Sequence, residues 1–373
     1  MDRKTSWLTS FASRRQAQKA SCALPSVHTP LTLSHTMSVR VSKPFSQLWS
    51  RSVILLDGAL GTELEKLIPA PRLPWSLDGL ILQPQLTQRL HERYLQAGAD
   101  VITTNAFRTN GRTLRQVRWN QVQLPETADA ALKEVWAHGR WEELEGALTR
   151  YSAQLAQSAR RQLDKEDEVC IAGNLAPLED CFSPQRAPSI SEAYAEHRRK
   201  AQCFAQAGVD LILIETMGAL GEAQGALEAA LEAGVPVWIS FVARGGALLS
   251  GESFSQGFAM LKAHLPSSLC GVLLNCCEPE EIDALLPRMA SAFGGSSVRV
   301  GAYANVQAPD QDGVWRRRAD MSTNAYAHRA QQWVERGASI VGGCCGTTPQ
   351  DIAALQQCFK LTYHGDHSRI KEL

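Results

Sequence analysis

Two pairs of adjacent cysteines lie in the C-terminal part of the 373-residue chain, Cys276–Cys277 in LLNCC and Cys344–Cys345 in GGCCG. Neighbouring cysteines rarely form a disulfide with each other, because the geometry of the bridge needs more room than one peptide unit allows. Thiolates from the two pairs could instead bind one metal ion. Three protein ligands with an open fourth position are typical of a catalytic zinc site, and thiolates favour zinc or copper(I) over magnesium or calcium.

Other interpretations of these cysteines remain open at this point. All four thiols could close a structural metal site, or one could pack beside three ligands. They could also be small packing residues, because free cysteine is among the most buried residue types. A redox role for the adjacent thiols ranks last, since the chain has no C-x-x-C motif.

The segments that would position these residues form a repeated pattern. From residue 51, short β-rich apolar runs alternate with longer stretches of helical periodicity. Several predicted helices end at a glycine followed at once by a strand, as in LQAGADVITT and AQAGVDLILIE, which is typical of a helix C-cap. The predicted strands cover residues 52–56, 100–104, 168–173, 210–215, 236–241, 271–275, 298–303 and 338–342.

Eight strands in this pattern predict an α/β fold, a (β/α)8 TIM barrel. An open doubly wound sheet is the alternative, but no G-x-G-x-x-G follows the first strand. Residues 106–167 predict two or three helices, part of them a helical insertion between strands 2 and 3.

Polar or ligand-forming residues follow almost every predicted strand. They are Asp57, Asn105, Asn174, Glu215, Asn275 with Cys276, Tyr303 with Asn305, and Cys344 with Cys345. In a barrel the loops after the carboxyl ends of the strands build the active site. The sixth and eighth strands flank the seventh, so we expect their cysteines to face one point.

Segments at and after the predicted strands resemble those of a known protein family. The chain resembles the homocysteine S-methyltransferase family over about residues 51–357, in the segments DGALGTELEK (57–66), AGADVITTNAFRTN (97–110), GVDLILIETM (208–217), NC (275–276) and GGCCGTTPQDI (342–352). The resemblance implies a barrel with a Zn(2+) cofactor bound by Cys276, Cys344 and Cys345, with Cys277 as a neighbour rather than a ligand.

The resemblance also implies substrate-binding residues. It implies that Asp57 and Glu215 bind the amino acid substrate, and carboxylates can indeed pair with an α-ammonium by charge-assisted hydrogen bonds. Asn105 and Asn275 match family positions, and Asn275 could equally be a structural residue. Asn174 departs from the family pattern, in which serine is frequent at that position.

The implied reaction moves a methyl group from a sulfonium donor, S-methylmethionine or S-adenosylmethionine, to the thiol of L-homocysteine, giving methionine. Betaine is an alternative donor, for which Trp75 or Trp119 could form a cation–π wall, although packing is the plainer role for each. Methylation of another thiol or selenol, and a zinc-binding barrel without activity, also remain open.

Composition limits the class of protein. The formal net charge is zero, with 44% hydrophobic and 20% charged residues, so nothing indicates a nucleic-acid or anionic-membrane partner. The substrates are expected to be small molecules, and the oligomeric state is left open. Several cysteines lie in apolar runs, so we expect a reduced, cytoplasmic protein. Three histidines in helical stretches are expected to be surface or packing residues: His91, His197 and His328.

The first fifty residues differ from the rest of the chain. Residues 1–50 are rich in Ser, Thr, Arg and Lys and contain one acidic residue, Asp2. We therefore predict an N-terminal extension at 1–50 and a barrel domain at 51–373. The extension could be an organelle transit peptide, a disordered tail, or the result of a start codon assigned upstream of Met37.

Overall fold

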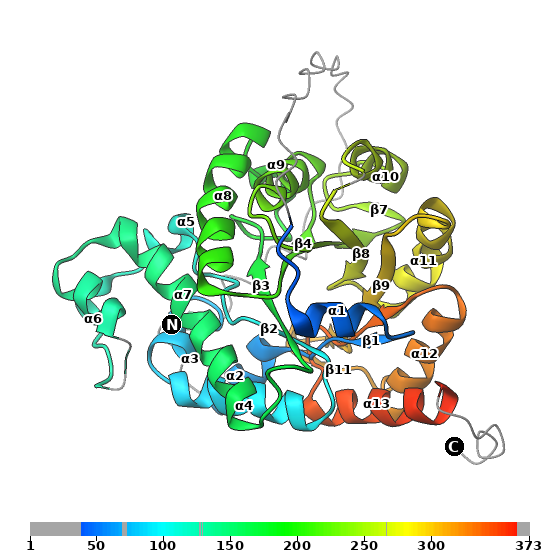
Figure 1. The fold of residues 1–373 in the computed structure, drawn as a ribbon, viewed down its shortest axis with the longest axis horizontal. Helices are drawn as coiled ribbons and strands as arrows, with labels where there is room; N and C mark the ends of the chain where they lie inside the picture. Colours follow the sequence, from blue (N-terminus) through cyan, green and yellow to red (C-terminus); the bar gives the residue numbers. More distant parts are fainter. Residues whose placement is uncertain (1–38, 69–72, 127, 129, 266, 364–373) are drawn as a thin grey trace.

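The computed structural model describes residues 39–68, 73–126, 128, 130–265 and 267–363. Eight parallel strands form its main sheet, in the order β1-β12-β9-β8-β5-β4-β3-β2. A parallel bridge between Leu56 and Val101 joins the two outer strands, and Asp57 donates its backbone N–H to the Val101 carbonyl at 2.9 Å. The sheet is therefore closed into a ring (Figure 1), which confirms the predicted (β/α)8 barrel and rules out the open sheet.

All eight predicted strands are present, with small shifts at their ends. They are β1 (Ile54–Leu55), β2 (Val101–Thr103), β3 (Cys170–Leu175), β4 (Leu211–Met217), β5 (Val237–Phe241), β8 (Leu269–Asn275), β9 (Arg299–Tyr303) and β12 (Ile340–Val341). Two short hairpins that the sequence analysis missed follow β5 and β9: β6 (Ala243–Arg244) with β7 (Ala247–Leu248), and β10 (Gln307–Pro309) with β11 (Trp315–Arg317).

Helices surround the ring (Figure 1). They include α2 (Leu60–Leu67), α3 (Leu77–Ile81), α4 (Pro84–Gln96), α8 (Ile190–Ala207), α9 (Leu220–Leu231), α10 (Phe254–Ala263), α11 (Pro279–Phe293), α12 (Thr323–Glu335) and α13 (Pro349–Tyr363). Helix α8 shows the local signals clearly: Ser189 and Glu192 form a capping box at its start. It ends at Gly208, whose φ of 83° is left-handed, as the Gly-before-strand pattern predicts.

The helical insertion between β2 and β3 is also confirmed. It contains α5 (Gly111–Leu114), a 3₁₀ turn at Trp119–Gln121, α6 (Ala130–Ala137) and α7 (Trp141–Gln162). Its helices share a separate hydrophobic cluster, in which Trp119 packs edge-on against Trp136 with 5.0 Å between ring centroids. Trp119 is thus a packing residue.

Side chains along the strands alternate between two hydrophobic clusters. One faces the helices, and the other fills the barrel lumen with residues such as Ile54, Leu56, Val101, Cys170, Ala172, Leu211, Leu213, Trp238, Leu273, Tyr303 and Ile340. Because successive side chains of a strand point to opposite faces, the side chain of every second residue in a strand points into the lumen. On β2, β3, β4, β5 and β8 the last lumen position is polar: Thr103, Asn174, Glu215, Ser240 and Asn275.

The opposite end of the barrel is covered by a helix that we had placed in the N-terminal extension. Helix α1 (Lys43–Trp49) buries Phe45 and Leu48 in the lumen cluster. Trp49 stacks on Phe45 and lies 4.6 Å from the Arg299 guanidinium. Residues 43–49 are therefore structurally part of the barrel, because its lower lumen needs an apolar cover. The targeting alternatives concern residues 1–38, which lie outside the described residues.

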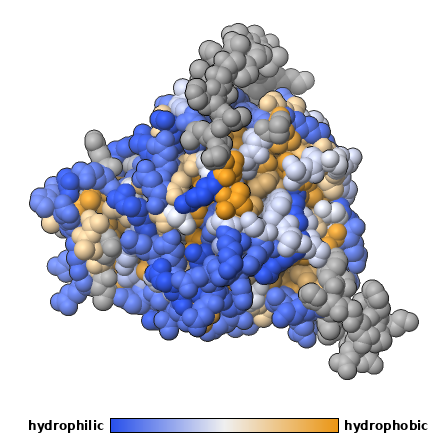
Figure 2. Space-filling view, in the orientation of Figure 1, coloured by the Kyte–Doolittle hydropathy of each residue, from blue (hydrophilic) through white to orange (hydrophobic). Residues whose placement is uncertain are grey.

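The remaining surface features are ordinary. Polar and charged residues cover most of the face shown in Figure 2. In the part of the chain that the structure describes, no helix is both long and apolar enough to cross a membrane. His91 is a buried packing residue, His197 is buried beside the Glu222 carboxylate, and His328 is exposed.

Candidate active site

The three predicted metal ligands lie together. Cys276 directly follows β8, Cys344 and Cys345 lie after β12, and their Sγ atoms all lie within 4.8 Å of one another. The Sγ atoms of Cys276 and Cys345 are 3.9 Å apart. Zn–S bonds of about 2.3 Å in a tetrahedron place two sulfurs about 3.8 Å apart, so the spacing fits one zinc ion. Among the described residues, this is the one group of three or more His, Cys, Asp or Glu side chains with such spacing.

The backbone around these thiols adopts conformations that bring them together. Cys276 has a left-handed φ of 52°, which is uncommon for a residue with a side chain. At Gly343 a Cβ atom would lie 2.3 Å from the Thr347 hydroxyl, so only glycine fits. The Cys345 N–H donates to the Asn305 side chain at 3.1 Å, a contact that the sequence analysis did not predict.

Cys277 lies outside the three-thiol group. Its side chain is buried, and burial raises the pKa of its thiol to about 12. Hydrogen bonds from the thiols of Cys276 and Cys344 lower the pKa of Cys345 well below its ordinary value. The thiols of Cys276 and Cys344 therefore stabilise a single thiolate, that of Cys345. A bound cation would be needed to stabilise all three cysteines as thiolates.

Asn275 ties the strand ends together beneath the thiols. Its carbonyl oxygen accepts hydrogen bonds from the Thr216 N–H at 3.1 Å and the Ser240 hydroxyl at 2.7 Å. Its amide nitrogen donates to the Thr216 hydroxyl at 2.8 Å and to the Cys344 sulfur at 3.9 Å. Because Asn275 is fully buried and both ends of its amide are paired, these contacts favour the structural role among our two expectations.

Asn275→Ala should destabilise the fold and weaken the thiol group. Removing this amide leaves the Thr216 N–H and the Ser240 hydroxyl unpaired in a buried place, which costs about 1–3 kcal/mol for each group. We expect a lower free energy of unfolding in urea and a lower metal content in the same preparation. Wild-type metal content in a destabilised variant would contradict the link between Asn275 and Cys344.

Two carboxylates line the same end of the barrel. Glu215, on β4, accepts hydrogen bonds from the Asn174 amide and from the Tyr303 hydroxyl, the latter at 3.4 Å. Asp57, after β1, accepts from the Thr103 N–H at 2.8 Å and the Thr103 hydroxyl at 3.1 Å. Burial raises the pKa of each carboxyl to about 8, and the negative charge of Glu215 adds to the shift of the Asp57 pKa. A cationic group bound between the carboxylates would relieve both shifts.

The raised pKa of Asp57 predicts a pH-dependent stability. The folded protein binds the proton of this carboxyl more tightly than the unfolded chain, whose value is 3.8. The stabilising contribution is therefore complete below about pH 4 and is lost as the pH rises through about 8. Without substrate, Asp57→Asn should gain stability relative to the wild type between about pH 5 and pH 9, measured by urea unfolding.

Asp310→Asn provides a matched control for this comparison. A side-chain hydrogen bond from Arg316 lowers the pKa of the half-buried Asp310, so its carboxylate stays ionised across the tested range. The stability difference between this variant and the wild type should therefore stay constant. Parallel behaviour of the Asp57 and Asp310 variants would contradict the prediction.

Two other predicted residues lie at the edge of the site. The Asn105 amide donates to the Ser76 carbonyl at 3.2 Å and so holds the segment before α3. Trp75, next to that segment, is 37% exposed and lies against Gly61 in α2.

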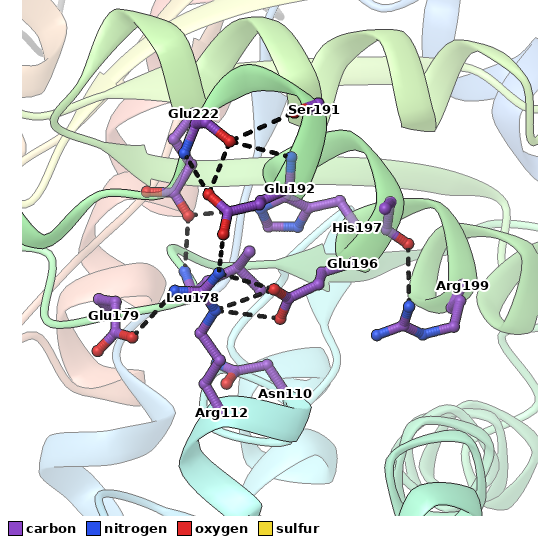
Figure 3. A network of polar contacts seen from close by, with 12 residues as sticks. Asn110, Arg112, Leu178, Glu179, Ser191, Glu192, Glu196, His197, Arg199 and Glu222 are labelled. Carbon is purple, nitrogen blue, oxygen red and sulfur yellow. Dashed lines mark hydrogen bonds and ion pairs between the residues drawn. The ribbon is translucent and has the colours of Figure 1, made fainter.

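A second polar network anchors the loop that leaves β3 (Figure 3). Glu222 accepts the Leu178 N–H at 2.7 Å and lies 3.5 Å from the His197 ring. Arg112 pairs with Glu196 at 2.8 Å and with Glu179 at 3.2 Å. The network therefore links the insertion, the β3–α8 loop, α8 and α9, and it fixes the chain that follows Asn174.

Known proteins share this architecture. The homocysteine methyltransferase MmuM from Escherichia coli, in its metallated form, superposes with a TM-score of 0.65 and 24% sequence identity, covering 85% of this chain and 99% of that chain. This likeness supports the fold. A family model described as homocysteine S-methyltransferase matches residues 54–359. The chain belongs to the homocysteine S-methyltransferase family.

Curated relatives within the homocysteine S-methyltransferase family align over most of their length. Homocysteine S-methyltransferase 1 from Zea mays is 29% identical over 334 residues, which cover 82% of this chain and 94% of the maize protein. Selenocysteine Se-methyltransferase from Brassica oleracea var. italica is 25% identical, covering 81% and 88%. The family membership identifies the chain as a methyltransferase, and the match begins at β1, leaving α1 outside it.

Proposed function

We propose that this enzyme transfers a methyl group from a sulfonium donor, S-methylmethionine or S-adenosylmethionine, to the thiol of L-homocysteine. The observation that carries the proposal is the placement of three convergent thiols, the buried Asp57 carboxylate and the half-buried Glu215 carboxylate at one end of one barrel. The thiols suit a soft cation, and the carboxylates suit an ammonium. Homocysteine carries a thiol and an α-ammonium, separated by a short chain.

Zn²⁺ is the cation that we propose for Cys276, Cys344 and Cys345. A free thiol has a pKa near 8.5, so only a few per cent is ionised at neutral pH. Zinc held by these residues would lower the pKa of a thiol at its open position, so that the thiolate forms at neutral pH.

The residues of the chain itself would orient the reactants. Glu215 and Asp57 would bind the α-ammonium, and their raised pKa values would fall as the positive charge arrives. Fixing the ammonium at one end and the sulfur at the other aligns the sulfur with the methyl carbon of the donor. Such alignment can lower a barrier by about 7–11 kcal/mol. A sulfonium donor loses its charge as the methyl group leaves, so the leaving group needs no proton.

The first experiment combines metal analysis with a donor screen. Protein purified under reducing conditions is assayed for zinc and then for methionine formation from homocysteine with S-methylmethionine, S-adenosylmethionine or betaine. We expect about one zinc per chain and turnover with a sulfonium donor. Turnover with betaine alone would overturn the donor assignment. Zinc without turnover would indicate a binding protein, and fully reduced, folded protein that takes up no zinc would overturn the mechanism.

The acceptor is tested in the same assay. A relative in the family is a selenocysteine Se-methyltransferase, so L-selenocysteine is compared with L-homocysteine as the acceptor. A higher kcat/KM for the selenol would shift the proposal to that substrate class while keeping the same thiol group and carboxylates.

A further inference from the structure

Asn174 occupies the top of the barrel lumen beside Glu215. On β3, Cys170 and Ala172 point into the lumen, and Asn174 is the next residue on the same face of the strand. Its backbone N–H donates to the Thr104 hydroxyl at 3.1 Å. Its side-chain amide nitrogen donates to one carboxylate oxygen of Glu215. The amide of Asn174 is thus held in one orientation, next to a carboxylate that we assign to substrate binding.

The other end of the same amide has no partner. The Asn174 carbonyl oxygen is buried and accepts no hydrogen bond from any described residue, and the side chain is 2% exposed. A buried amide oxygen without a donor destabilises the folded protein, so such atoms are uncommon. Among the lumen residues at this level, Asn275 has both ends of its amide paired. The Asn174 carbonyl oxygen is therefore available to accept a hydrogen bond from a bound molecule.

We propose that the Asn174 carbonyl oxygen accepts a hydrogen bond from the α-ammonium of the amino acid substrate. This inference rests on the proposed function and adds a third acceptor to the two carboxylates. An ammonium has three N–H donors and no acceptor, so three acceptors around it satisfy it fully. Asn174 would contribute twice, because its nitrogen orients Glu215 while its oxygen binds the substrate. It therefore acts as a specificity residue for thiols that carry an α-amino group.

The proposal is tested by binding, so it does not depend on turnover. The dissociation constants of L-homocysteine and of 4-mercaptobutanoic acid, which lacks the amino group, are measured by calorimetry on the zinc-loaded protein. We expect Asn174→Ser to weaken homocysteine binding about tenfold, because serine is too short to reach the same position. Binding of 4-mercaptobutanoic acid should change by less than about twofold.

Asn174→Asp separates direct contact from orientation of Glu215. Aspartate keeps an acceptor at this place but replaces the donor to Glu215 with a like charge. A direct contact predicts that Asn174→Asp binds homocysteine more tightly than Asn174→Ser. A role limited to orienting Glu215 predicts the reverse order, and that result would overturn the proposal.

Asn110→Ser is a matched control. Asn110 is also a buried asparagine with an unpaired amide nitrogen among the described residues, but its side-chain oxygen caps α5. Serine is an equally good N-cap, so this variant should keep the wild-type ratio of the two dissociation constants. If wild-type protein fails to bind homocysteine, the proposed function fails. If it binds and Asn174→Ser leaves the ratio unchanged, only the role of Asn174 fails.

Discussion

Cys344→Ser is expected to abolish both metal binding and methyl transfer. The three sulfurs of the site lie within 4.8 Å of one another, so removing one leaves two ligands for a cation that needs three from the protein. Loss of residues that merely support a metal ligand costs about 10- to 100-fold in affinity or activity, and loss of a ligand should exceed that. Zinc per chain, measured by mass spectrometry of the reduced protein, should fall from about one to near zero.

Cys277→Ala is the control for this substitution. Cys277 neighbours a predicted ligand in sequence, yet its thiol is not one of the three that lie within 4.8 Å of one another. Removing the Cys277 thiol should leave the zinc content unchanged. It should lower the free energy of unfolding only by the small cost of the cavity that it leaves. Equal zinc loss in the two variants would show that the cysteines matter for folding rather than as ligands. Full zinc in the Cys344 variant would contradict the proposed metal centre.

Glu215→Gln should reduce kcat/KM for homocysteine by about 100-fold, because it removes the negative charge that pairs with the α-ammonium. Hydrogen bonds to charged groups contribute about 1.5–3 kcal/mol each. The carboxylate is already oriented by Asn174 and Tyr303, so little reorganisation would offset the loss. Zinc content should stay at the wild-type level, since Glu215 is not among the three convergent ligands.

The comparison with 4-mercaptobutanoic acid makes this prediction specific. That thiol lacks the ammonium, so its rate should be nearly equal in the wild type and in Glu215→Gln. Glu222→Gln serves as a control, because Glu222 is a buried glutamate whose contacts are Leu178 and His197, outside the lumen. A similar loss for both thiols in the Glu215 variant would mean that Glu215 supports the fold and does not bind the amino group.

Much of the fold follows from local signals in the sequence. Each barrel strand is a short apolar run, and glycines such as Gly208 mark the helix ends with a left-handed φ. In a ring of eight parallel strands, β8 and β12 lie on either side of β9, so the loops that follow these two strands lie close together. The convergence of Cys276 with Cys344 and Cys345 was predictable for that reason.

Other features depend on contacts between distant segments. The pairing of Asn174 and Tyr303 with Glu215 is set by the lumen register of β3, β4 and β9, which no single segment reveals. Helix α1 is hidden in the overall composition of residues 1–50, which is that of a polar extension. Its own signals are local: Ser42 caps the helix, and Phe45, Leu48 and Trp49 recur at helical spacing.

The division of the three thiols between β8 and β12 constrains when a metal centre can form during synthesis. The ribosome makes Cys276 and Cys277 long before it makes Cys344 and Cys345. The two pairs are separated by a stretch of chain that includes α11, β9 and α12. A nascent chain that has reached only β8 therefore holds one of the three ligands, and no fragment lacking β12 can hold the ion in this way. For the zinc site proposed above, metal loading would follow assembly of nearly the whole ring, and the supply of zinc would act on the folded enzyme rather than on the early steps of folding.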